Sequence, residues 1–274
     1  MGNVKTYLFC KPLKAGRKAV PFEINLDPQG QDILLPWGFA NAVYQTLRLE
    51  PGSGSLHAPV CSTWVFMSRG STKRSPTRPL GRPDSEAVRN GNVMTARVCI
   101  LLLLAATRGV WSILEQPSTS LMHLHPTFQR VMAMMNIRRL GIRMSDFGGA
   151  SRKSTLLYSS HQEIDQMLAE RRPATGPTDQ QPQMTIRYID GSGKNRCKGG
   201  ADLKASQHYP KGFGKALSRV RSRNQQALRR QAKRLLKLAS RTQHNVDERT
   251  TVNAHWMKHA NLGPVLSYLA ARTR

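Results

Sequence analysis

A cysteine and a glutamate occupy two short segments, each with the pattern of an apolar strand that runs into a loop. The first segment, residues 57–64, reads HAPVCSTW around Cys61, and the second, residues 111–117, reads WSILEQP around Glu115. If the two loops lie side by side, a thiol and a carboxylate face one substrate. The alternative is structural: a cysteine after a strand is commonly a small buried apolar residue, and the glutamate could cap a turn.

The elements around these two residues predict how they are positioned. The stretch Val93–Gly109 is apolar enough for a buried helix, so residues 57–117 predict a strand–helix–strand unit. In such a unit both strands end at the same edge of a parallel sheet, which is where α/β proteins bind ligands. We therefore expect Cys61 and Glu115 to meet at one cleft.

The rest of the first 170 residues adds elements of the same kind. Apolar spacing and turn residues predict each of them. They are a strand at 18–24 that ends at Glu23, an acidic turn at 31–34 with Asp32, a helix at 36–49, a long polar loop at 69–92, a helix at 121–135, and two strands at 137–160 around the turn 146–149.

The C-terminal part has a different composition. Residues 171–183 read RRPATGPTDQQPQ and indicate a linker, residues 184–198 indicate a hairpin, and residues 211–241 contain many basic residues and no acidic one. Apolar residues recur there at helical spacing, so a basic amphipathic helix could lie along a phosphate backbone; a solvated surface helix or a disordered tail remains open. The candidate phosphate contacts are Lys211, Lys215, Arg219, Arg223, Arg230 and Arg234.

The composition favours an intracellular protein that binds nucleic acid. The 274 residues include 42 Lys plus Arg and 16 Asp plus Glu, a net charge of +26, which suits a polyanion first and an anionic membrane surface second. The four cysteines have neither disulfide-framework nor zinc spacing, and we expect no metal. We expect neither a signal peptide nor a membrane span, and a nuclear location ahead of a cytoplasmic one.

The order of these segments resembles a cytosine-5 methyltransferase core, in the version carried by a large set of dinoflagellate proteins. In that dinoflagellate set, the first loop typically reads Gly-Pro-Pro-Cys-Ser-Ser-Trp and the second Glu-Gln-Pro. This chain has Ala58-Pro59-Val60-Cys61-Ser62-Thr63-Trp64 and Glu115-Gln116-Pro117. The resemblance covers about residues 7–165, and more weakly residues 203–214.

The resemblance implies roles for individual residues. Cys61 would be the nucleophile that adds to carbon 6 of a flipped-out cytosine, with its thiol pKa lowered by its surroundings. Glu115 would hold the nitrogen 3 edge of the ring, and Lys153 would support the catalytic loop or the substrate backbone. Glu23, Asp32 and Pro59 would contact the cofactor, S-adenosylmethionine.

Several positions depart from the family pattern. The glycine-rich first loop is replaced by LFCKPLK at residues 8–14, the proline before the nucleophile is Val60, and the asparagine after the glutamate is Gln116. The sequence therefore leaves open whether the site is catalytically active.

We predict an α/β fold with a Rossmann-like three-layer methyltransferase-type sheet, incomplete at its N-terminal side. It would occupy residues 1–170, followed by a linker at 171–183 and a basic, partly helical or disordered region at 184–274. The expected function is an S-adenosylmethionine-dependent cytosine-5 methyltransferase-like protein that acts on or binds nucleic acid. The alternatives are a non-enzymatic nucleic-acid-binding protein that retains the fold, and a degenerate fragment of a mobile element.

Overall fold

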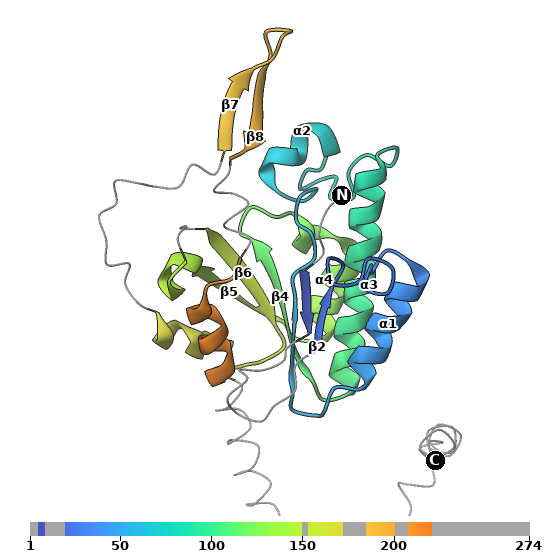
Figure 1. Cartoon of the computed structure of the whole chain (residues 1–274), viewed down its shortest axis with the longest axis vertical. Helices are drawn as coiled ribbons and strands as arrows, with labels where there is room; N and C mark the ends of the chain where they lie inside the picture. Colours follow the sequence, from blue (N-terminus) through green and yellow to red (C-terminus); the bar gives the residue numbers. More distant parts are fainter. Residues whose placement is uncertain (1–4, 9–19, 150–152, 172–184, 201–207, 221–274) are drawn as a thin grey trace, which may run out of the picture. The chain divides into compact units, whose positions relative to one another are not determined.

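Two strands joined by a long helix run side by side at one edge of a four-stranded sheet. In the computed structural model of the chain, β3 (Gly54–His57) pairs in parallel with β4 (Trp111–Pro117), and α3 (Glu86–Thr107) connects them (Figure 1). The strand order is β3-β4-β6-β5, and β6 (Ser154–Ser159) is antiparallel to both β4 and β5 (Arg138–Arg143). The predicted strand–helix–strand unit is confirmed, but the sheet is mixed rather than parallel.

The structure describes residues 5–8, 20–149, 153–171, 185–200 and 208–220, all of which belong to one compact unit, residues 1–224. Two further pairs of strands form separate two-stranded sheets. The remaining elements are β1 (Lys5–Leu8) antiparallel to β2 (Val20–Glu23), β7 (Thr185–Ile189) antiparallel to β8 (Asn195–Gly199), α1 (Pro36–Leu47), α2 (Arg69–Thr72), α4 (Pro126–Met134), the short 3-10 helices Phe66–Ser68, Met122–Leu124, Met144–Phe147 and Ile164–Glu170, and the helical residues 211–220.

Most elements lie where the sequence pattern put them. Each of the following predictions has a counterpart in the structure. The strand at 18–24 is β2, the helices at 36–49 and 121–135 are α1 and α4, the two strands at 137–160 are β5 and β6, and the hairpin at 184–198 is β7 with β8. The loop predicted at 69–92 is wrong in part, because it contains α2 and the first turns of α3. Those turns read EAVRNGN, which carries too few apolar residues to show a helical pattern.

Side chains of the central strands alternate between two cores, one on each face of the sheet. Leu114 of β4 and Leu156 and Tyr158 of β6 belong to the first core, with α1, α3 and α4. Figure 1 shows these three helices gathered on one side of the sheet. Trp64, from the loop that follows β3, is fully buried in this core.

The second core lies on the opposite face and includes residues from beyond the predicted linker. Ile113 of β4 and Leu157 of β6 pack there with the 3-10 helices at 144–147 and 164–170. The helical residues 211–220 contribute four buried side chains to the same core: Phe213, Ala216, Leu217 and Val220. The basic amphipathic helix predicted there therefore begins as part of the sheet's own packing.

α3 is long and apolar enough to cross a membrane by length and composition alone, in the part of the chain that the structure describes. A core helix of a soluble protein has the same composition, and α3 packs against α1, α4 and β4. Val98 and Leu101 are completely buried. The helix ends at Thr107, and Gly109, two residues later, has a φ of 66°, the left-handed conformation that favours glycine after a helix.

Candidate functional site

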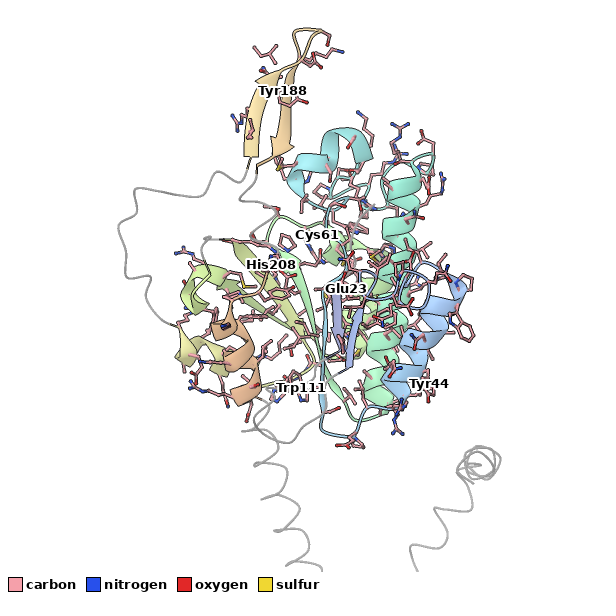
Figure 2. The ribbon with its side chains drawn as sticks, viewed as in Figure 1. Glu23, Tyr44, Cys61, Trp111, Tyr188 and His208 are labelled. Atoms are coloured by element: carbon pink, nitrogen blue, oxygen red, sulfur yellow. The ribbon has the colours of Figure 1, made fainter. Side chains whose placement is uncertain are left out.

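The carboxyl ends of β3 and β4 bring the two candidate catalytic residues to one edge of the sheet. His57, the last residue of β3, pairs with Leu114, so Glu115 is the next residue along β4 and Cys61 follows in the loop after β3. In Figure 2, Cys61 lies toward the end of the sheet opposite Trp111, where β4 begins. The predicted convergence of the two loops thus follows from parallel pairing and register.

Gln116 ties the two loops together. Its side-chain amide donates a hydrogen bond to the carbonyl oxygen of Pro59 at 3.0 Å, and its own oxygen accepts one from the Ser120 hydroxyl at 2.9 Å. Gln116 and Ser120 are both buried. A second link joins the backbone N–H of Leu121 to the carbonyl of Trp64 at 3.0 Å. Gln116 therefore fixes the position of the Cys61 loop relative to β4.

Glu115 is buried and accepts hydrogen bonds from two elements distant in sequence. Its Oε1 lies 3.4 Å from the Lys153 ammonium, which makes an ion pair. Its Oε2 accepts a hydrogen bond of 2.9 Å from the Tyr209 hydroxyl. Lys153 directly precedes β6, the antiparallel neighbour of β4. The sequence identified Lys153 as a candidate, whereas Tyr209 carried no recognisable signal.

The Cys61 thiol has a raised pKa, opposite to the prediction from the resemblance. Burial is the main cause, and the negative charge of Glu115 raises the pKa further. The positive charge of Lys153 acts in the other direction and lowers it. Because the thiolate is the nucleophilic form, Cys61 is mainly a thiol at neutral pH, and Lys153 is the cation that favours its ionisation.

A buried arginine that the sequence did not single out holds the far side of the Cys61 loop. The Arg74 guanidinium stacks on the Trp64 ring, 3.4 Å from its centroid. It also donates hydrogen bonds to the Pro79 carbonyl at 2.6 Å and to the Asn92 side chain at 2.9 Å. Burial lowers the pKa of Arg74 to about 10, so it stays charged at neutral pH. Residues 69–92 contain several arginines, and nothing in the sequence distinguishes Arg74 from the others as the buried one.

α3 approaches the same loop closely because it carries a glycine there. A Cβ atom on Gly91 would lie 2.6 Å from the Thr63 hydroxyl oxygen and 3.2 Å from an Arg74 nitrogen. Real Cβ atoms essentially never come within 3.0 Å of another heavy atom, so any other residue would force the Thr63 side chain to shift. The glycine therefore lets α3 pack directly against the Thr63 side chain.

A cavity of about 410 Å³ opens beside the Cys61 loop. Small-molecule sites commonly occupy cavities of this size, with mostly apolar walls and a few polar groups. The lining combines apolar side chains with carboxylates, hydroxyls and an amide. It consists of Ile24, Asp32, Leu34, Val60, Ser62, Thr63, Glu86, Ala87, Asn90, Gly91 and Met94.

The three predicted cofactor residues lie differently with respect to this cavity. Asp32 lines it, and its Oδ1 accepts a hydrogen bond of 2.8 Å from the Leu34 backbone. Glu23 is buried beside the lining residue Ile24, and its backbone N–H donates to the Gln31 side chain at 2.6 Å. Pro59 is buried directly before the lining residue Val60. Asp32 is thus part of the cavity wall, whereas Glu23 and Pro59 do not line the cavity.

The predicted phosphate contacts divide between described and undescribed residues. Lys211, Lys215 and Arg219 are exposed on the helical residues 211–220, and Arg219 pairs with Glu170. Arg223, Arg230 and Arg234 lie outside the described residues. Within the described ranges, no group of three or more His, Cys, Asp or Glu side chains is placed to hold a metal ion.

Comparisons of the chain with protein-family models, with curated proteins and with solved structures found no match.

Proposed function

We propose that the chain is an S-adenosylmethionine-dependent cytosine-5 methyltransferase-like protein that acts on nucleic acid through Cys61 and Glu115. We further propose that its α/β unit is a Rossmann-like methyltransferase core, incomplete on the N-terminal side. The observation that carries the proposal is a convergence at one sheet edge. The parallel register and the Gln116–Pro59 hydrogen bond bring the Cys61 loop and the Glu115–Lys153 ion pair together there, next to the cavity of about 410 Å³.

The walls of the cavity suit S-adenosylmethionine. The cofactor carries a positive sulfonium and an adenine ring, and the cavity offers the carboxylates of Asp32 and Glu86 with the apolar side chains of Leu34 and Met94. Asp32 and Asn90 would hold its polar groups. When bound, the cofactor supplies the methyl group.

The residues of the chain would perform the remaining chemistry. Cys61, once ionised, forms a bond from Sγ to carbon 6 of cytosine, and the ring electrons shift to carbon 5, which takes the methyl group. Glu115 holds the nitrogen 3 edge of the ring during this shift by accepting a hydrogen bond from the exocyclic amino group of that edge. Transfer of the carbon 5 proton to a water molecule then breaks the bond from Sγ to carbon 6, releases Cys61 as the thiolate and restores the double bond between carbons 5 and 6. Lys153 favours the thiolate that starts the sequence and pairs with Glu115.

Titration calorimetry with S-adenosylmethionine tests the cofactor site. Ala87 is exposed and lines the cavity, so Ala87→Trp fills the cavity without disturbing the core. Val93→Trp is the matched control, because Val93 lies on the same helix, is 42% exposed and does not line the cavity. We expect binding by the wild type and the control and none by Ala87→Trp. Absence of heat with the folded wild type would remove the enzymatic proposal.

A second candidate is a nucleic-acid-binding protein without catalysis, and the exposed cations favour it. Lys211, Lys215 and Arg219 are spaced four residues apart, so they share one face of the helical residues 211–220, opposite the buried side chains. A row of cations on a well-packed helix suits a phosphate backbone. The raised pKa of Cys61 also agrees with a site that binds but does not react.

The salt dependence of duplex binding tests this role without harming the fold. Deleting residues 211–220 would remove core side chains, so the better variant is Lys211→Gln with Lys215→Gln. If both lysines contact phosphates, the slope of log K against log salt falls in magnitude by about 2. Arg89→Gln with Arg108→Gln, at exposed positions of α3 and just after it, is the control. An unchanged slope in the lysine variant rejects the helical cations as contacts.

A further inference from the structure

The segment that carries Tyr209 is anchored firmly to the sheet. Phe213 is almost fully buried, and the Tyr209 ring stacks on it with centroids 5.1 Å apart and planes at 26°. Phe213 in turn meets Phe147 edge to face at 6.0 Å. The backbone at Gly212 approaches so closely that a Cβ there would lie 2.2 Å from the Phe147 carbonyl oxygen. This packing fixes the place from which the Tyr209 hydroxyl reaches the site.

Tyr209 and Lys153 each donate to a different oxygen of Glu115. The Tyr209 hydrogen bond, at 2.9 Å, is the shorter, and the Lys153 contact, at 3.4 Å, is at the long limit for a hydrogen bond. Two donors on two oxygens fix the plane of a carboxylate. Each oxygen has a second lone-pair direction, so the carboxylate can still accept a hydrogen bond from a substrate.

We propose that Tyr209 is a positioning residue of the candidate site, and that residues 208–220 complete the site by holding the Glu115 carboxylate in place. The proposal rests on the proposed function in one respect, the identity of the group that Glu115 binds. The effect of Tyr209 on the Glu115 carboxylate does not depend on that function. Without the hydroxyl, the Lys153 ammonium still contacts this carboxylate, at 3.4 Å from Oε1. We expect the ammonium then to move closer to Glu115 and to lose part of its influence on the Cys61 thiol.

This arrangement predicts two separate consequences of Tyr209→Phe, which keeps the ring stack and removes only the hydroxyl. First, because Lys153 lowers the pKa of Cys61, its displacement shifts the pH profile of Cys61 alkylation by iodoacetamide to higher pH. Second, covalent trapping of a 5-fluorocytosine oligonucleotide slows by about tenfold, the scale of one lost hydrogen bond to a charged group.

The experiment uses the full chain, with Cys61 followed by peptide mass spectrometry. Tyr44→Phe, at a tyrosine that is 56% exposed on α1, is the matched control and should leave both readouts unchanged. An alkylation profile of Tyr209→Phe identical to that of the wild type overturns the proposal.

A double-mutant cycle supplies an independent check: in the Glu115→Gln background, Tyr209→Phe should have no further effect on alkylation, and an equal effect in both backgrounds also overturns the proposal. If the wild type traps no oligonucleotide but the alkylation profile shifts, the proposed function fails and the role of Tyr209 stands.

Discussion

Acidification below pH 6.5 should destabilise the fold through buried histidines. His57 is completely buried on β3, where its Nε2 contacts the Ser55 hydroxyl at 3.0 Å. Burial lowers the pKa of His57 to about 4. Burial lowers the pKa of His125 to about 4 as well, with the positive charge of Arg74 acting in the same direction. Both histidines are therefore neutral in the folded state at pH 5, whereas the unfolded chain binds protons below pH 6.5.

The magnitude follows from the two pKa values. Where the unfolded state binds more protons, the free energy of unfolding falls as the pH falls. For a folded pKa of about 4 and an unfolded pKa of 6.5, each histidine removes about 2 kcal/mol between pH 7 and pH 5. The stability is fully present above pH 6.5 and is lost as the pH falls toward 4. The two together remove about 4 kcal/mol, a large part of a typical domain's stability.

Urea denaturation at pH 7 and pH 5 measures this loss. The wild type should lose at least about 4 kcal/mol, and His57→Gln, which starts less stable, should lose only about half as much. The comparison isolates His57 from every other titrating group. If the free energy of unfolding falls by the same amount in the wild type and in His57→Gln between the two pH values, the conclusion that His57 is buried in its neutral form is wrong.

Two further predictions concern the Cys61 loop. Glu115→Gln removes the negative charge that raises the pKa of Cys61, so alkylation of Cys61 at pH 7.5 should accelerate, whereas Lys153→Met should slow it; equal rates in both variants would contradict the coupling. Gly91→Ala places a methyl group against the loop and should lower the free energy of unfolding by about 1–3 kcal/mol. Gly70→Ala, with no atom within 4 Å of its Cβ, is the control for the denaturation measurement.

The sequence predicted the local elements well because their signals are local. The apolar run of α3, the turn at residues 146–149 and the alternation of the central strands depend on residues close in the chain. The parallel pairing of β3 with β4 also followed, since a helix of that length between two strands returns the chain in the same direction. These features together predicted that Cys61 and Glu115 would approach each other.

The contacts that complete the site could not be predicted, because they join distant segments. The insertion of β6 between β4 and β5, which brings Lys153 to Glu115, depends on strand pairing and leaves no local pattern. The hydrogen bond from Tyr209 spans 94 residues and crosses the predicted linker. The burial of Arg74 under the Trp64 ring was hidden by the many exposed arginines around it. Dehydration, which raises the pKa of Cys61, appears only once the loop is packed.

Covalent trapping by a 5-fluorocytosine oligonucleotide, with S-adenosylmethionine present, tests most directly whether Cys61 and Glu115 converge on one pyrimidine. Fluorine at carbon 5 prevents release of the thiol, so a denaturant-stable adduct should form with the wild type. The adduct should be absent with Cys61→Ser and much reduced with Glu115→Gln. A wild type that forms no adduct, or an adduct that persists in Cys61→Ser, would contradict the account.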